Sequence, residues 1–90
     1  MRSDVQGIIN EFAKVYPNKE VLQIVDFREK GIYVVFAIPK NQIEDRKEWL
    51  DGLHSVDMDT LKIVDGFQPL DNDSLLLLSL GKDRIIYKKQ

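Results

Sequence analysis

The chain of 90 residues contains no cysteine, which excludes a disulfide framework, a thiolate metal site and a cysteine nucleophile. Its five glycines are scattered and form no GxGxxG, P-loop or GxSxG motif, so nucleotide binding by those routes is excluded. The longest apolar runs, 32–39 and 75–80, are far shorter than the ~18 residues of a membrane span. Residues 1–10 contain no apolar run of signal-peptide length, so we expect a cytoplasmic protein.

Composition predicts one ordinary globular domain over residues 1–90. The chain is 43% apolar and 31% charged, as in ordinary soluble domains. Its 90 residues are enough for a single core and too few for two. The formal net charge of −2 argues against a nucleic-acid binder. Four cations gather near the C-terminus beside Tyr87, but so small a group is more often solvated charge than a phosphate-binding patch: Lys82, Arg84, Lys88 and Lys89.

The first half of the chain predicts a helix followed by two long strands. Ser3 and Gln6 have the spacing of a capping box, and apolar residues then recur at helical intervals until Pro17: Val5, Ile8, Ile9, Phe12, Val15 and Tyr16. Residues 20–28 favour a strand with Val21, Val25 and Phe27 on one side. After a turn at 29–31, in which a glycine supplies positive φ, residues 32–38 are apolar on both faces and predict a central strand.

The second half predicts a short hairpin and then a helix. Residues 53–58 and 62–67 form two short strands around a polar turn at Asp59 and Thr60. The run 71–74 offers N-cap residues to a leucine-rich helix over 75–80 that ends at Gly81. A second hairpin, pairing 74–80 with 84–87, is the alternative. The resulting fold class is α+β: a mainly antiparallel sheet of about four strands, with an N-terminal and a C-terminal helix on one face.

Leucine at 75–78 also suggests an interface, because a helix turns ~100° per residue and four consecutive side chains cannot all face one core. Part of the run Leu75–Leu80 is therefore exposed or buried between subunits, and a homodimer through this run is one hypothesis.

Catalytic and metal chemistry find little support in the sequence. His54 is the single histidine, and its strand neighbour Ser55 should point to the opposite face, so the two cannot easily act as base and nucleophile. We expect His54 to be an exposed or half-buried residue on the same side as Val56. Asp71–Ser74 resembles the opening of a calcium loop, but Leu75 and Leu76 replace a ligand and the required glycine. We therefore expect no enzyme activity, no metal and no cofactor.

The acidic middle of the chain is the strongest indication of a partner. Nine carboxylates and three cations between Glu44 and Asp73 give this segment a net charge of −6, whereas the rest of the chain sums to +4. A hairpin with core on one face would display these carboxylates as one negative surface, which suits a basic protein. Trp49 is either the aromatic anchor of that surface or a core residue. The predicted partner-binding residues are Trp49, Asp51, Asp57, Asp59 and Asp65.

A similar pattern occurs in a group of small bacterial and phage-associated α+β proteins. Their pattern, Trp-Leu-Asp-Pro, Val-(Asp/Asn)-x-x-Thr-Gly-x-Val and Gly-Phe-x-Pro-Leu, is matched at Trp49–Asp51, Val56–Asp57, Thr60, Ile63 and Gly66–Leu70. This chain departs from it at Gly52, where proline is expected, and at Leu61, where the turn glycine is expected. The resemblance implies an accessory, immunity or phage-encoded protein, and it carries over no catalytic residue.

Two functions follow from this reading of the sequence. The first is a non-catalytic interaction module, such as an immunity protein or phage-encoded inhibitor, that presents the acidic hairpin to a basic protein. The second is a small-ligand-binding domain. Its pocket would lie between the N-terminal helix and the sheet, lined by Phe12, Tyr16, Phe36 and Trp49.

Overall fold

The computed structural model describes residues 3–42, 52–64 and 82–89. Within them, helix α1 (Ser3–Val15) is followed by strands β1 (Lys19–Phe27), β2 (Ile32–Pro39), β3 (Leu53–Asp57) and β4 (Ile85–Lys88). Short 3-10 turns follow β1 (η1, Arg28–Lys30) and β2 (η2, Lys40–Gln42), and a third precedes β4 (η4, Lys82–Arg84). The α+β class is therefore confirmed. The predicted C-terminal helix at 75–80 and its alternative hairpin strand at 74–80 lie outside the described residues.

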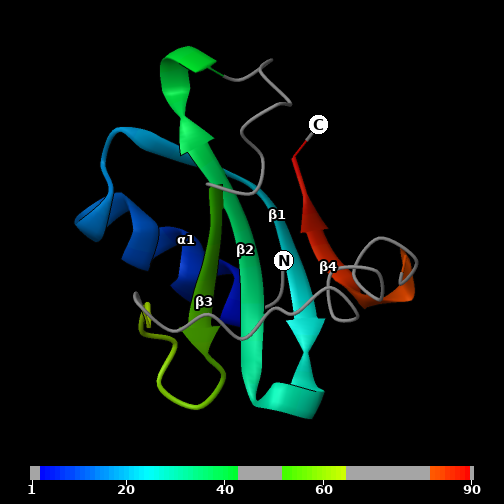
Figure 1. The fold of residues 1–90 in the computed structure, drawn as a ribbon. Helices are drawn as coiled ribbons and strands as arrows, with labels where there is room; N and C mark the ends of the chain where they lie inside the picture. The colour runs from blue at the N-terminus through cyan, green and yellow to red at the C-terminus, as the bar shows by residue number, and fades with distance from the viewer. Residues whose placement is uncertain (1–2, 43–51, 65–81, 90) are drawn as a thin grey trace.

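The four strands form one antiparallel sheet in the order β3-β2-β1-β4, and α1 lies across one face of it (Figure 1). The central position of β2 explains why its sequence is apolar on both faces. The β1–β2 turn ends at Gly31, whose φ of 69° is left-handed, as the sequence predicts.

The fourth strand of the sheet is β4 and not the predicted strand at 62–67, of which the structure describes residues 62–64. Residues 62–64 do turn back along β3, with a hydrogen bond from Val64 N to Ser55 O and one from Asp57 N to Lys62 O. Only one bridge results in the described part of this segment, between Val56 and Ile63, so no full strand forms there. The outer strand beside β1 is instead β4, from the C-terminal segment (Figure 1).

The core lies between α1 and the sheet. Val5, Ile8 and Phe12 of the helix are at most 1% exposed and meet side chains from three strands: Val21, Ile24, Tyr33, Val35, Ala37 and Val56. The helical spacing of the apolar residues also predicts Val15 on the core-facing side of α1. This prediction is wrong, because Val15 is 47% exposed at the end of the helix. A smaller cluster of Phe27, Ile32 and Val34 is buried separately.

A β-bulge in β1 corrects the predicted faces of that strand. Strict alternation would place the side chains of Val21 and Ile24 on opposite faces of the sheet, yet both lie in the core that faces α1. The register of β1 against β2 shifts between Val21 and Gln23, and the extra residue reverses the alternation at that point. The bulge thus turns Val21 toward the end of α1, where the candidate site lies.

Candidate functional site

The acidic hairpin is only partly within the described residues, which include Asp57 and Asp59 but not Trp49, Asp51 or Asp65. Asp57 Oδ1 accepts hydrogen bonds from the backbone N–H groups of Asp59 at 2.9 Å and Thr60 at 3.0 Å. These two bonds, that from Thr60 first, lower the pKa of Asp57 because they favour the ionised carboxylate. Asp57 is therefore a structural residue of the turn, and Asp59 is the exposed carboxylate at its tip.

The same turn contains an unusual backbone conformation. Leu61 has a φ of 59°, in the left-handed region that leucine rarely adopts. Its side chain is half-buried and packs against the main core, close enough to α1 that a Cβ added at Gly7 would meet its Cδ1 at 3.0 Å. We infer that this packing offsets the strain of the backbone.

His54 lies where the sequence predicts, half-buried on the same face of β3 as Val56. Its ring contacts Phe12 edge-on at 5.2 Å between centroids and Tyr16 at 5.0 Å. Its Nε2 lies 3.1 Å from Nζ of Lys19, whose ammonium group also lies 4.9 Å from the centroid of the Tyr16 ring. The histidine thus helps to hold a lysine at the end of α1.

A pocket of about 440 Å³ opens beside this lysine, between the C-terminal end of α1, the start of β1 and the end of β4. Its lining residues all belong to the described part of the chain: Ile9, Phe12, Ala13, Pro17, Lys19, Glu20, Val21, Lys40, Tyr87 and Lys89. The lining combines apolar side chains with three lysines and one glutamate. The pocket lies beside the core rather than within it, because Ile8 and Phe12 of the helix remain fully packed.

Of the four side chains predicted to line such a pocket, the structure places one, Phe12, in its wall. Tyr16 contacts His54 and Lys19 next to the pocket without lining it. Phe36 lies on the opposite face of the sheet, because Val35 and Ala37 on either side of it face α1. Trp49 is outside the described residues.

The sequence did not predict the three lysines that line the pocket, Lys19, Lys40 and Lys89. Lys19 and Lys40 lie together because β1 and β2 pair antiparallel from Lys19 opposite Pro39, and Lys40 N donates to Asn18 O at 3.0 Å. The antiparallel pairing of the two predicted strands is therefore the signal in the sequence that could have brought Lys19 and Lys40 together. Lys89 joins them through β4, where its N–H donates to Leu22 O and its Nζ forms an ion pair with Glu20.

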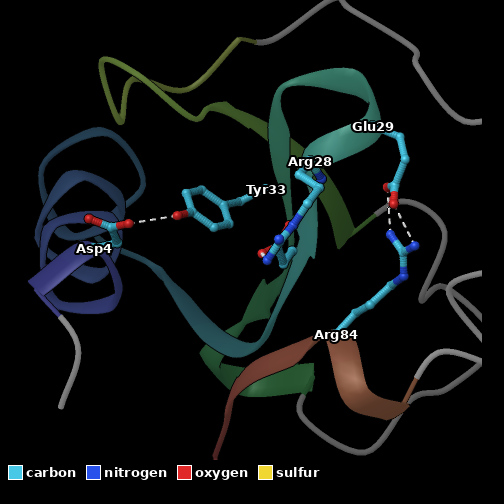
Figure 2. Close-up of polar contacts among 6 residues, drawn as sticks. Asp4, Arg28, Glu29, Tyr33 and Arg84 are labelled. Carbon is cyan, nitrogen blue, oxygen red and sulfur yellow. Dashed lines mark hydrogen bonds and ion pairs between the residues drawn. The ribbon is translucent and has the colours of Figure 1, made fainter.

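Two further ion pairs hold the other end of the sheet (Figure 2). Both terminal nitrogens of Arg84 lie 2.5 Å from the carboxylate of Glu29, which ties η4 to the β1–β2 turn. Arg28 Nη2 donates to Asp26 Oδ2 at 2.8 Å and lowers the pKa of Asp26, which is buried. On the far side of the sheet, Tyr33 Oη donates to Asp4 Oδ2 at 2.6 Å and joins the first turn of α1 to β2.

The Arg84–Glu29 pair predicts a pH dependence of stability. The hydrogen bond from Arg84 lowers the pKa of Glu29 from 4.5 to about 2, so the carboxylate binds its proton less readily in the folded protein than in the unfolded chain. This contribution is present above about pH 4.5 and is lost as the pH falls toward 2. We expect Glu29→Gln to reduce the acid dependence of the free energy of unfolding, measured by urea denaturation between pH 5 and pH 2.5.

Arg84→Gln provides the control, since it removes the same pair from its other side and should reduce the acid dependence in the same way. Some dependence will remain in both variants, because the pKa values of Asp26 and Asp57 are also lowered. Parallel pH curves for wild type and both variants would contradict the assignment.

Searches among known protein families, curated proteins and solved structures found no match for this chain. Among the described residues, no group of three or more histidine, cysteine or acidic side chains could hold a metal ion. Helix α1, with 13 residues, is the longest in that part of the chain, and none there is long and apolar enough to cross a membrane.

Proposed function

We propose that this protein is a non-catalytic binding domain that takes a small ligand in the pocket at the end of α1. The observation that supports the proposal is the pocket itself, whose volume of about 440 Å³ lies within the range of small-molecule sites, roughly 300–1,000 Å³. Such sites combine an apolar wall with a few polar groups that orient the ligand. Here Phe12, Val21 and Tyr87 supply the wall, and the lysines and Glu20 supply the polar groups.

The elements around the pocket favour a preformed site. Phe12 is fixed by the core at 1% exposure, the bulge in β1 sets the direction of Val21, and the Glu20–Lys89 ion pair holds two of the lining side chains together. A site built on a helix and two paired strands loses little conformational entropy when a ligand binds.

The proposal can be tested by filling the pocket. Ala13 lines it yet is exposed on α1, so Ala13→Leu should occupy part of the space without disturbing the core. We expect small fragments of mixed charge to shift the backbone amide signals of Ile9, Val21 and Tyr87 in ¹⁵N NMR spectra of the wild type. Ala13→Leu should weaken that binding about tenfold, because the added side chain takes space that the ligand would occupy.

Asn10→Leu is the matched control, because Asn10 is exposed on the same helix and does not line the pocket. It adds the same side chain and should leave fragment binding unchanged. If no fragment shifts the pocket amides, or if both variants reduce binding equally, the pocket is not a ligand site.

The acidic hairpin is a second candidate, as a surface for a basic protein partner. The observation that favours it is the turn geometry, in which the two backbone bonds to Asp57 fix the tip and leave Asp59 exposed. Asp59→Asn should weaken such a complex. It should also reduce the loss of affinity that added salt causes. Asp57→Asn is unsuitable as a probe of charge alone, because it also perturbs the turn.

A further inference from the structure

The charge of the pocket is opposite in sign to that of the whole chain. The protein has a formal net charge of −2, yet the pocket is lined by three lysines and one glutamate, a local net charge of +2. The three lysines come from separate segments, at the start of β1, in η2 and just after β4. Because the fold brings together cations that are far apart in the sequence, the positive charge is a property of the site and not of one basic stretch.

The three lysines differ in what already holds them. Lys89 is neutralised by its ion pair with Glu20. Lys19 contacts the aromatic ring of Tyr16 and donates a hydrogen bond to Nε2 of His54, which accepts it as a neutral imidazole. Neither contact neutralises the charge of the lysine. Lys40 is exposed and forms no ion pair within the described part of the chain. Lys19 and Lys40 therefore both line the pocket, and no carboxylate in the described part of the chain forms an ion pair with either of them.

The wall beneath these lysines is apolar. Ile9, Ala13 and Pro17 present accessible hydrocarbon surface, and Tyr87 adds an aromatic ring from β4. A free inorganic anion would leave this surface in contact with water, whereas a neutral apolar molecule would leave the two lysines without a partner. A ligand with an anionic head and an apolar body satisfies both parts of the site.

We infer that the ligand of the proposed pocket is an amphiphilic organic anion, a carboxylate or phosphate ester whose head lies against Lys19 and Lys40 and whose apolar body covers Ile9 and Tyr87. This inference rests on the proposed function and specifies its ligand class. Lysine suits either head group, because its ammonium group acts as a compact point charge without the paired donors of arginine. An exposed charge contact contributes modestly, so selectivity between head groups should be measurable without being extreme.

Four probes with one common tail separate the head group from the body: octanoate, octyl phosphate, octanol and octylamine, all below their aggregation limits. Dissociation constants are measured from the amide shifts of Ile9, Val21 and Tyr87 in ¹⁵N NMR titrations. We expect one or both anions to bind about 3- to 10-fold more tightly than octanol, and octylamine to bind most weakly. The octanoate and octyl phosphate titrations distinguish a carboxylate site from a phosphate site.

Lys40→Gln tests the head-group contact, since Lys40 is exposed and its loss should not affect folding. It should weaken anion binding about two- to fivefold and leave octanol binding unchanged. Lys30→Gln is the matched control, because Lys30 is also exposed and follows the end of β1 that is farther from the pocket. A strand of 9 residues puts it about 25 Å from the pocket. Lys30→Gln should change neither.

The outcomes separate this inference from the proposed function. If all four probes bind with equal affinity, or octanol or octylamine binds best, the pocket is a ligand site but the ligand is not an anion, and the inference is overturned. If Lys40→Gln and Lys30→Gln weaken anion binding equally, the anion responds to the net charge of the protein and not to a contact with Lys40. The inference is then again overturned. If no probe shifts the pocket amides, the proposed function fails as well.

Discussion

Phe12→Ala is expected to lower the free energy of unfolding by about 3–5 kcal/mol, the largest effect of any substitution considered for this protein. Phe12 is 1% exposed, and it joins the core to the pocket and to the ring of His54. Truncation would remove its buried surface and leave a cavity that α1 and the sheet cannot close, because Ile8 and Val35 on either side are already fully packed. Urea denaturation monitored by circular dichroism measures the loss.

Val15→Ala is the matched control for this prediction. Val15 is also an apolar residue of α1, but it is 47% exposed and outside the core, so its truncation should change stability by less than about 0.5 kcal/mol. A loss below about 1 kcal/mol for Phe12→Ala would mean that α1 does not pack on the sheet as described. The core and the pocket would then both need to be reassigned.

Gly52→Ala is expected to destabilise the fold by about 1–3 kcal/mol, through lack of space and not through backbone conformation. A Cβ at position 52 would lie 2.8 Å from the backbone oxygen of Ala37 and 3.1 Å from Cγ2 of Ile38. The oxygen belongs to the central strand β2 and cannot move without disturbing the sheet.

Gly31 allows the two causes of a glycine requirement to be distinguished. It has a left-handed φ of 69°, and a Cβ there would have no neighbour within 4 Å. Asparagine tolerates left-handed φ better than alanine does, so Gly31→Asn should be milder than Gly31→Ala. At Gly52 asparagine should be at least as harmful as alanine. Equal tolerance of alanine and asparagine at Gly52, with stability near wild type, would contradict the close approach of this residue to β2.

Local patterns in the sequence were sufficient to predict the first half of the fold. Helical spacing up to Pro17 gives the extent of α1, and two apolar runs separated by Gly31 give the β1–β2 hairpin. The exposure of Val15 and the bulge near Val21 could not be predicted, because both depend on where the core ends and not on any residue preference. A period-2 pattern carries no mark of an inserted residue.

Contacts between distant segments explain what else was missed. The pairing of β4 with β1 joins residues sixty or more positions apart, and nothing in the sequence of Ile85–Lys88 specifies its neighbour. For that reason the sequence predicts solvated charge at Lys89, whereas the structure places this residue in the lining of the pocket, paired with Glu20. Leu61 is a different case: a positive φ at leucine is invisible in the sequence and arises from tertiary packing against α1.

Titration of the ¹⁵N-labelled wild type with octanoate is the most direct test of the central claim, that the pocket at the end of α1 is a ligand site. The account predicts saturable shifts confined to the amides around the pocket, such as Ile9, Val21 and Tyr87, with none at the hairpin tip around Asp59. Shifts that do not saturate, or that appear at the hairpin and not at the pocket, would contradict it.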